Sequence, residues 1–399
     1  MKHNPANNIQ DLQYFGENGG VNPSISDSST YTFLTAKAMS DTFEGNTDGC
    51  YLYSRHTSPS NLNLASALAA MENTASATVT ASGMGAITPV LLQLCKTNEH
   101  IISSRTIYGG TYALLKNFFP RLAIHTSFVD ITNIAAVEAA ITPKTRVIYC
   151  EALSNPLLEV APLEKLSALA KKHNLKLVVD NTFTPLSITP VHHGADVVIH
   201  SLTKFINGSS DTVGGVICGT EDFINSLKDV NDGACMLLGS TMDSMRSASI
   251  LKNLRTLHLR IQKHSENALY LTNELQKLGL NVVYPGLENF KDKEVFESML
   301  NSDFGYGGMF TLNLESLEKA NALMELMQQK NIGYLAVSLG FYKTLFSAPG
   351  SSTSSEISEE EQQKMGLSNG LIRFSIGLDH DIKRTFTMIK SCLEELNIC

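Results

Sequence analysis

The sequence predicts an α/β protein, with a doubly wound, mostly parallel sheet in a first domain and a smaller α+β second domain. From Pro59 onward, short apolar runs alternate with helical stretches, as in a sheet with crossover helices. The runs 177–179 and 197–199 are apolar at every position, which is typical of parallel strands covered on both faces. Polar residues follow several of these runs, at the sheet edge where such folds bind ligands.

The N-terminal residues 1–59 are polar, weakly periodic and predicted to form an extended arm. A helix over 61–71, after a Ser60 cap, follows at the start of the α/β domain, which spans 60–255. Strands are predicted over 75–80, 100–103, 124–129, 146–151, 175–180, 196–200 and 214–218. The helices predicted between them include 85–95, 133–141 and 163–173.

The smaller α+β domain is predicted over 256–399. A long helical stretch begins near Asp243 and continues past Asn267. The elements expected after it are strands over 281–284, 309–314 and 372–376 and a helix over 317–329. A Ser-rich loop, 347–355, precedes the last strand and is the low-complexity patch of the sequence.

The charge and the hydropathy of the sequence argue against nucleic acid and membranes as partners. The chain has 399 residues and a net charge of −8, with its acidic residues spread out, so nucleic acid is not an expected partner. No apolar run approaches the roughly 20 residues that span a bilayer, and residues 1–10 lack the apolar core of a signal peptide. We therefore expect a cytoplasmic protein that binds no membrane.

Cysteine and histidine patterns predict neither a disulfide scaffold nor a metal site. The seven cysteines are odd in number and form no C-x-x-C pair. His192 and His193 are adjacent but lack a third ligand at metal-binding spacing.

Three chemically useful groups are predicted at strand ends, where one ligand can touch all of them. Asp180 ends the strand 175–180, Lys204 follows the strand 196–200, and Ser82-Gly83-Met84-Gly85 joins a strand to a helix. Each alone is commonplace, because lysines are usually solvated and aspartates and glycines often form turns. Together they supply an amine for a Schiff base, a carboxylate for a pyridinium nitrogen and a helix N-terminus for a phosphate. These are the needs of pyridoxal 5'-phosphate (PLP).

Longer motifs surround these groups: Val-Asp-Asn-Thr-Phe at 179–183, His-Ser-Leu-Thr-Lys-Phe at 200–205 and Asp-Thr-Val-Gly-Gly at 211–215. They resemble the Cys/Met-metabolism family of PLP-dependent enzymes, and the resemblance runs from about Gly16 to the C-terminus. That family includes methionine γ-lyases, O-acyl-homoserine sulfhydrylases, cystathionine γ-lyases and cystathionine γ-synthases. The resemblance implies the fold of type I PLP-dependent transferases and a PLP-dependent enzyme.

The resemblance also assigns residues to the cofactor. It implies that Lys204 forms the Schiff base and shuttles protons, and that Asp180 pairs with the ring nitrogen. Tyr108 resembles the tyrosine that stacks on the ring and acts as acid or base toward the leaving group, and Asn155 resembles the contact of the cofactor hydroxyl. The residues that resemble phosphate ligands are Gly83, Met84, Ser201 and Thr203.

Two further segments bear on the partner subunit and the substrate. Tyr53 and Arg55 resemble residues that reach the phosphate of a neighbouring subunit, which implies at least a dimer and, by the family likeness, a tetramer. Arg373 resembles the arginine that binds the substrate α-carboxylate, with help from Ser338. Arg373 lies within an apolar strand, where an unpaired cation is costly, and this independently favours an anionic ligand.

The choice within the family depends on a few positions. Val337 stands where enzymes that handle cystathionine often carry Glu, and an apolar residue suits the methyl thioether of methionine better than a distal ammonium. Gly110 argues the other way, because methionine γ-lyases commonly have Cys there, and 344–350 departs from the usual loop. We expect γ-elimination on L-methionine first, acyl-homoserine sulfhydrylation second, and cystathionine γ-synthase or γ-lyase chemistry third.

Two other classes of protein are less favoured. A binding paralogue that lost catalysis has no need of Lys204, Asp180, Tyr108 and Arg373 together. An aminotransferase remains a second possibility on this fold, and a half-reaction to pyridoxamine phosphate would reveal it.

Overall fold

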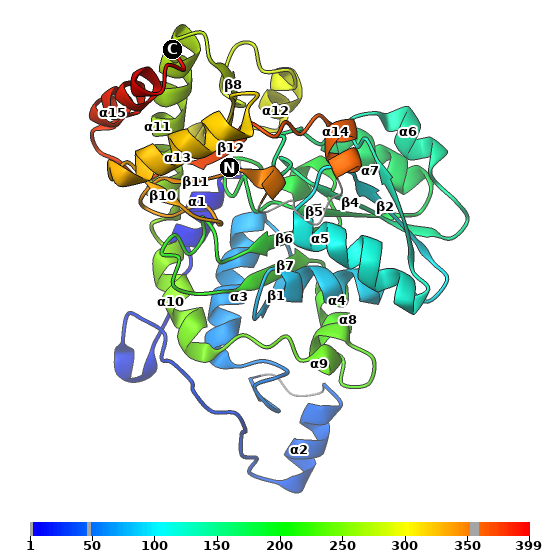
Figure 1. Ribbon diagram of the computed structural model, residues 1–399. Helices are drawn as coiled ribbons and strands as arrows, with labels where there is room; N and C mark the ends of the chain where they lie inside the picture. Colours follow the sequence, from blue (N-terminus) through cyan, green and yellow to red (C-terminus); the bar gives the residue numbers. More distant parts are fainter. Residues whose placement is uncertain (1–2, 46–48, 352–358) are drawn as a thin grey trace.

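The computed structural model describes residues 3–45, 49–351 and 359–399, and its largest element is a seven-stranded sheet (Figure 1). The strand order is β1-β7-β6-β5-β4-β2-β3. Pairing is parallel from β3 through β6, whereas β7 is antiparallel to both β1 and β6. The strands are β1 (Ser76–Thr80), β2 (His100–Ser104), β3 (His125–Val129), β4 (Thr145–Glu151), β5 (Lys176–Asp180), β6 (Val197–Ser201) and β7 (Gly215–Gly219). The predicted α/β, mostly parallel fold is confirmed.

Helices cover both faces of this sheet, and successive residues of one strand enter opposite cores. Val179 packs in the core that α3 (Pro59–Glu72) closes with Leu64. Its neighbour Val178 packs in the core that α4 (Met84–Leu94) closes with Leu91. Burial on both faces explains why the central strands read as unbroken apolar runs. The other helices of this part are α5 (Gly109–Ala113), α6 (Ile134–Ala139), α7 (Leu163–Lys172), α8 (Glu221–Lys228), α9 (Ala234–Leu238) and α10 (Ser244–Leu254).

A second, five-stranded sheet with order β10-β11-β12-β9-β8 forms from the C-terminal part of the chain. Its strands are β8 (Asn281–Val283), β9 (Met309–Asn313), β10 (Tyr334–Leu335), β11 (Leu345–Ser347) and β12 (Leu371–Ser375). Its helices are α11 (Leu257–Lys277), α12 (Lys293–Met299), α13 (Leu317–Gln329), α14 (Glu359–Met365) and α15 (Ile382–Glu395). Met309 and Leu339 belong to the same hydrophobic cluster as the first sheet, so the two sheets share part of one core. Residues 352–355 of the predicted Ser-rich loop lie outside the described residues.

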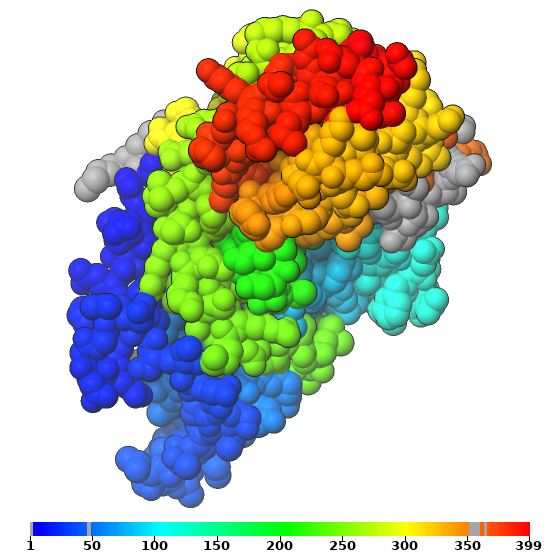
Figure 2. Space-filling view, turned by 60° about the vertical axis from the view of Figure 1, so that its left-hand side comes forward, coloured from blue at the N-terminus to red at the C-terminus, as the bar shows by residue number. Residues whose placement is uncertain are grey.

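The N-terminal arm differs from its prediction, because it contains two helices. α1 (Pro5–Gln10) is capped by Asn4 and packs on α3, while α2 (Ala36–Phe43) lies at the far end of the molecule (Figure 1). In Figure 2 the arm covers one side of the molecular surface. Phe15, Val21 and Leu34 are almost fully exposed along it.

Two helix boundaries also differ from the prediction. Ser58, rather than Ser60, caps α3 by accepting the Asn61 N–H at 3.3 Å, because Pro59 occupies the first helical position. The predicted single stretch from Asp243 divides into α10 and α11. No helix among the described residues is long and apolar enough to span a membrane.

Candidate active site

A cavity of about 230 Å³ opens where β4, β5 and β6 end, and the loops before β11 and strand β12 close it from the second sheet. Neighbouring parallel strands bring their carboxyl ends to one edge, which explains why distant motifs meet here. The cavity is lined by Ser82, Gly83, Met84, Ile87, Tyr108, Glu151, Leu153, Asn155, Asp180, Thr182, Phe183, Ser201, Thr203, Lys204, Val213, Ser338, Leu339 and Arg373.

One end of the cavity is suited to a phosphate. α4 begins there, directly after Gly83. The Gly85 N–H already donates to the Ser82 Oγ at 2.9 Å, so the N–H groups that remain for an anion are those of Gly83 and Met84. A Cβ on Gly83 would stand 2.9 Å from the Ser201 Cβ, so only glycine allows this close approach. The Thr203 Oγ1 accepts the Gly214 N–H at 3.1 Å and donates to the Gly214 carbonyl oxygen at the long distance of 3.5 Å, a weak bond that an anion could replace. The N–H groups of Gly83 and Met84, the dipole of α4 and the hydroxyls of Ser201 and Thr203 together suit an anion.

Two buried carboxylates stand side by side at the ends of β4 and β5. Glu151 and Asp180 are register partners in these strands, and both are buried. Burial raises the pKa of Asp180, although the Thr182 side chain and N–H oppose this rise by bonding its carboxylate. Burial and then the charge of Asp180 raise the pKa of Glu151 to about 8. Such a pair favours a cationic ligand beside Asp180.

Lys204 follows β6, and its amine points into the cavity. The Nζ donates to the Ser338 Oγ at 3.0 Å. Burial, followed by the charge of Arg373, lowers the pKa of Lys204 to about 8. Ser338 is held at a φ of 96°, which is uncommon for a non-glycine residue and often marks a functional position. The amine is therefore neutral more often than a surface lysine, as a nucleophile must be.

Arg373 enters the cavity from the middle of β12 and is buried. Its Nη1 donates to the Asn155 Oδ1 at 2.9 Å, and its Nη2 lies 3.3 Å from the Ser338 carbonyl oxygen. Burial lowers the pKa of Arg373 to about 10. The Nη2 also lies 3.4 Å from the Ser347 Oγ, so the hydrogen bonds of Arg373 to the described residues are all to neutral acceptors, and its charge can attract an anionic ligand in the cavity.

Tyr108 lies at the N-terminus of α5, and its side chain is partly exposed at the cavity. Its backbone N–H donates to Glu151 at 2.7 Å. A Cβ on Gly110 would stand 2.5 Å from the Tyr108 Cε1, so the observed position of the phenol depends on the absence of a side chain at 110.

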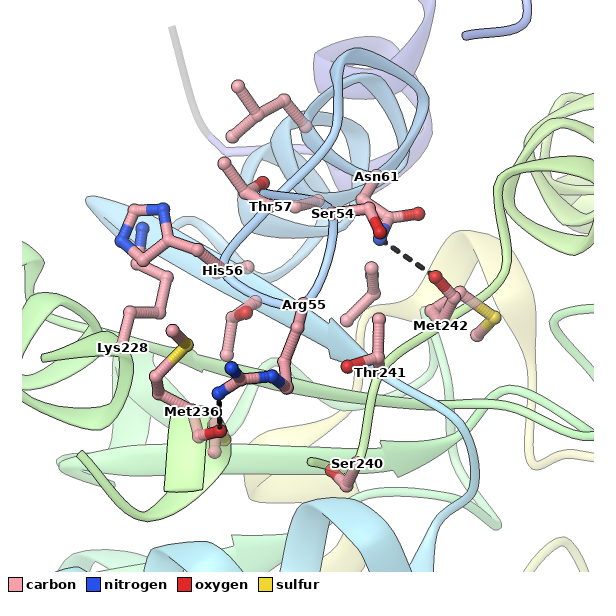
Figure 3. A pocket seen from close by; sticks show the side chains of 16 residues that line it. Ser54, Arg55, His56, Thr57, Asn61, Lys228, Met236, Ser240, Thr241 and Met242 are labelled. Carbon is pink, nitrogen blue, oxygen red and sulfur yellow. Dashed lines mark hydrogen bonds between the residues drawn. The ribbon is translucent and has the colours of Figure 1, made fainter. Parts of the chain in front are cut away.

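Three predicted site residues lie outside this cavity: Val337, which was expected in it, and Tyr53 and Arg55, which were expected to reach the site of a neighbouring subunit. Val337 is mostly exposed and lines a neighbouring cavity with Leu335 and Ala348. Tyr53 lies beside Arg55, whose guanidinium carbon is 5.7 Å from the Tyr53 ring centre. Figure 3 shows Arg55 in a separate small enclosure, where its Nη1 donates to the Met236 carbonyl oxygen at 2.9 Å.

Several lining residues were not identified from the sequence. Leu153 supplies an apolar wall and has no distinctive pattern. Phe183 and Val213 supply further apolar walls and stand in two of the quoted motifs, but were given no role. Thr182 was quoted within a motif but given no role, although its Oγ1 accepts the Ser201 N–H at 2.8 Å. Glu151 had a usable pattern, since it ends a predicted strand as Asp180 does.

The donors and acceptors of this cavity fit PLP. One cavity is lined by the Lys204 amine, whose pKa is lowered, and by the buried Asp180 carboxylate, whose pKa is raised. The N-terminus of α4 lines the same cavity. The lining residues that could hold the cofactor are Lys204, Asp180, Gly83, Met84, Ser201, Thr203, Asn155 and Tyr108.

Comparisons with known proteins agree with this donor set. Residues 7–386 match the family described as Cys/Met metabolism PLP-dependent enzyme. The chain is 42% identical to a methionine γ-lyase of Arabidopsis thaliana, over 97% of this chain and 89% of the relative. It is 33% identical to an L-methionine γ-lyase of Fusobacterium nucleatum, over 89% of each. A solved O-acetylhomoserine (thiol)-lyase of Campylobacter jejuni, described as putative and carrying N'-pyridoxyl-lysine-5'-monophosphate, superposes with a TM-score of 0.90. It is 28% identical and aligns over 98% of this chain and 100% of that one.

Proposed function

The chain belongs to the Cys/Met metabolism PLP-dependent enzymes, and we propose that it is a carbon–sulfur lyase that converts L-methionine to 2-oxobutyrate, methanethiol and ammonia. The observation that carries the proposal is the meeting of Lys204, Asp180 and Arg373 in one cavity. Relatives named methionine γ-lyase at 42% and 33% identity support the substrate.

The residues divide the chemical work as follows. When bound, PLP supplies an electron sink for the pair left on the substrate α-carbon. The Arg373 guanidinium binds the α-carboxylate, and the Lys204 amine removes the α-proton while Ser338 holds its Nζ. The Tyr108 phenol donates a proton to the departing thiolate. Asp180, as an anion, would hold the ring nitrogen of bound PLP in its protonated form.

Acyl-homoserine sulfhydrylation is the second candidate. The solved thiol-lyase from Campylobacter jejuni supports it by structural likeness, as does Gly110, which is not the cysteine common in methionine γ-lyases. The exposed position of Val337, outside the cavity lining, weakens the argument from that residue for a methyl thioether. Cystathionine chemistry stays third.

We also propose a homotetramer built from dimers with shared sites, located in the cytoplasm. The placement of Arg55 outside its own subunit's cavity lining supports sharing. All seven cysteines are free thiols, four of them buried, which suits a reducing compartment.

The test of the activity is 2-oxobutyrate release from L-methionine, run beside O-acetyl- and O-succinyl-homoserine with and without sulfide. We expect 2-oxobutyrate and methanethiol in equal amounts from methionine. The proposal is wrong if methionine is not turned over and an acyl-homoserine gives homocysteine only when sulfide is present.

A further inference from the structure

Glu151 is a buried carboxylate that the proposed chemistry does not use. It ends β4, lines the cavity and bonds two loops at once. Its Oε1 accepts the Tyr108 N–H at 2.7 Å, and its Oε2 accepts the Asn155 N–H at 2.8 Å. Tyr108 and Asn155 are 47 positions apart, so this one side chain fixes the distance between two segments of the site.

The connection continues to the second sheet. The Asn155 Oδ1 accepts the Arg373 Nη1–H at 2.9 Å, so Glu151, Asn155 and Arg373 form one chain of hydrogen bonds. The tyrosine beside the leaving group and the arginine for the substrate carboxylate are thereby tied to the same carboxylate. A shift of one of these groups by about 1 Å is enough to cost a large factor in rate.

Burying a carboxylate at this position costs free energy of folding, which suggests that Glu151 has a specific use. Glu151 is buried beside Asp180, and both burial and that neighbouring charge disfavour its anion. Two N–H donors and the charge of Arg373 act in the opposite direction. A glutamine has a single acceptor oxygen, and its NH₂ group would face one of the two N–H donors. A carboxyl group offers one acceptor oxygen to each of the two donors.

We propose that Glu151 is a positioning residue, whose carboxylate holds Tyr108, Asn155 and Arg373 in the one arrangement that the reaction requires. The proposal rests on the proposed PLP-dependent function of this cavity. It assigns Glu151 no contact with the reacting atoms.

The experiment compares wild-type holoenzyme with Glu151→Gln and with the matched control Glu159→Gln. Glu159 also accepts two hydrogen bonds, from Arg105 and Thr106, but does not line the cavity. Three quantities are measured: the visible absorbance of bound PLP, its visible circular dichroism, and kcat and KM for L-methionine. Circular dichroism reports the seating of the cofactor and needs no substrate.

We expect Glu151→Gln to keep its visible absorbance, because Lys204 and the phosphate ligands remain. Its circular dichroism should fall at least about twofold, and kcat/KM should fall roughly 10- to 100-fold, the loss expected when a charged acceptor of two hydrogen bonds is removed. The KM should rise, since Arg373 loses its support. Glu159→Gln should change each quantity by less than about threefold.

The inference is overturned if Glu151→Gln keeps both its circular dichroism and its kcat/KM within about threefold of wild type, or if Glu159→Gln loses as much. If Glu151→Gln does not fold, Glu151→Asp replaces it, because the shorter carboxylate cannot reach both N–H groups, and unchanged circular dichroism there has the same meaning. If wild type acts only on an acyl-homoserine, the kinetic arm uses that substrate, and the circular dichroism arm stands unchanged.

Discussion

At the scale of single residues, the site places two cationic side chains in one buried space. Lys204 and Arg373 both line the cavity, and burial lowers the pKa of each, to about 8 and about 10 respectively. The charge of Arg373 is the second cause of the shift at Lys204. With a pKa of about 8, roughly a tenth of the Lys204 amines are neutral at pH 7, compared with well under a hundredth for an ordinary lysine. Arg373 therefore affects the Lys204 amine, in addition to the substrate carboxylate that we propose it binds.

This coupling predicts the pH dependence of cofactor uptake by Arg373→Met. Removing the arginine charge removes a repulsion that disfavours protonated Lys204, so the pKa of the amine rises. The rate at which apo-protein develops the visible band with PLP should have its midpoint near pH 8 in wild type and at a higher pH in the variant. Lys204→Ala is the control and should develop no band. Identical midpoints in wild type and Arg373→Met would show that the two charges do not interact.

At the scale of elements, helix α11 connects the second sheet to the segment that carries the lysine. Its buried His264 has Nδ1 at 2.5 Å from the Ile376 carbonyl oxygen, just beyond β12. The same ring packs edge-on against Phe205, the residue after Lys204. Burial lowers the pKa of His264 to about 4, so its ring is neutral in the folded protein near neutral pH.

His264 predicts a loss of stability in mild acid. Its folded pKa lies below the unfolded value of about 6.5, so the unfolded chain binds more protons between these values. The stability linked to the neutral His264 ring is present above about pH 6.5 and is lost as the pH falls toward 4. At pH 5 the loss is about 2 kcal/mol. Urea unfolding at pH 7.5 and pH 5, at fixed protein concentration, measures it. His264→Gln should show a smaller difference between the two pH values, and an equal difference would assign the acid sensitivity to other groups.

The accuracy of the sequence prediction varied between elements for physical reasons. Strands such as β5 were placed to within a residue or two, because burial on both faces leaves an unbroken apolar run. α1 was missed, since six residues carry little periodicity and its stability comes from the Asn4 cap and packing on α3. β10 and β11 were not predicted, because they have only two and three residues. β10 pairs with β11, and β11 pairs with β12.

The same contrast holds for the site. Lys204 and Asp180 could be found because strand ends of a parallel sheet share an edge. Glu151 was read only as the last residue of a strand, because its two donors come from loops whose approach no local pattern encodes. Val337 was placed in the site by position alone, whereas the backbone of Ser338, at a φ of 96°, brings Ser338 rather than Val337 to the cavity.

At the scale of the whole molecule, the N-terminal arm leaves large apolar side chains uncovered by the rest of its own chain. Phe15, Val21 and Leu34 are almost fully exposed along it, and a second surface that covered them would remove their apolar area from water. Arg55 makes its described hydrogen bond to the Met236 carbonyl oxygen, which does not use the phosphate-binding geometry of a guanidinium. Both features fit an arm that completes the site of a second copy of the chain.

Shared sites predict complementation between two inactive proteins. Alone, Arg55→Ala should lose most of its activity and Lys204→Ala should lose all of it. In the experiment, equal amounts of the two variants are mixed, denatured and refolded together. About half of randomly formed dimers are mixed. In a mixed dimer, one of the two sites combines an intact Lys204 with an intact Arg55 from the other chain. About a quarter of wild-type activity should therefore return. Refolding each variant alone is the control. A mixture no more active than its components would show that Arg55 serves the site of its own subunit, and the tetramer of shared sites would lose its main support.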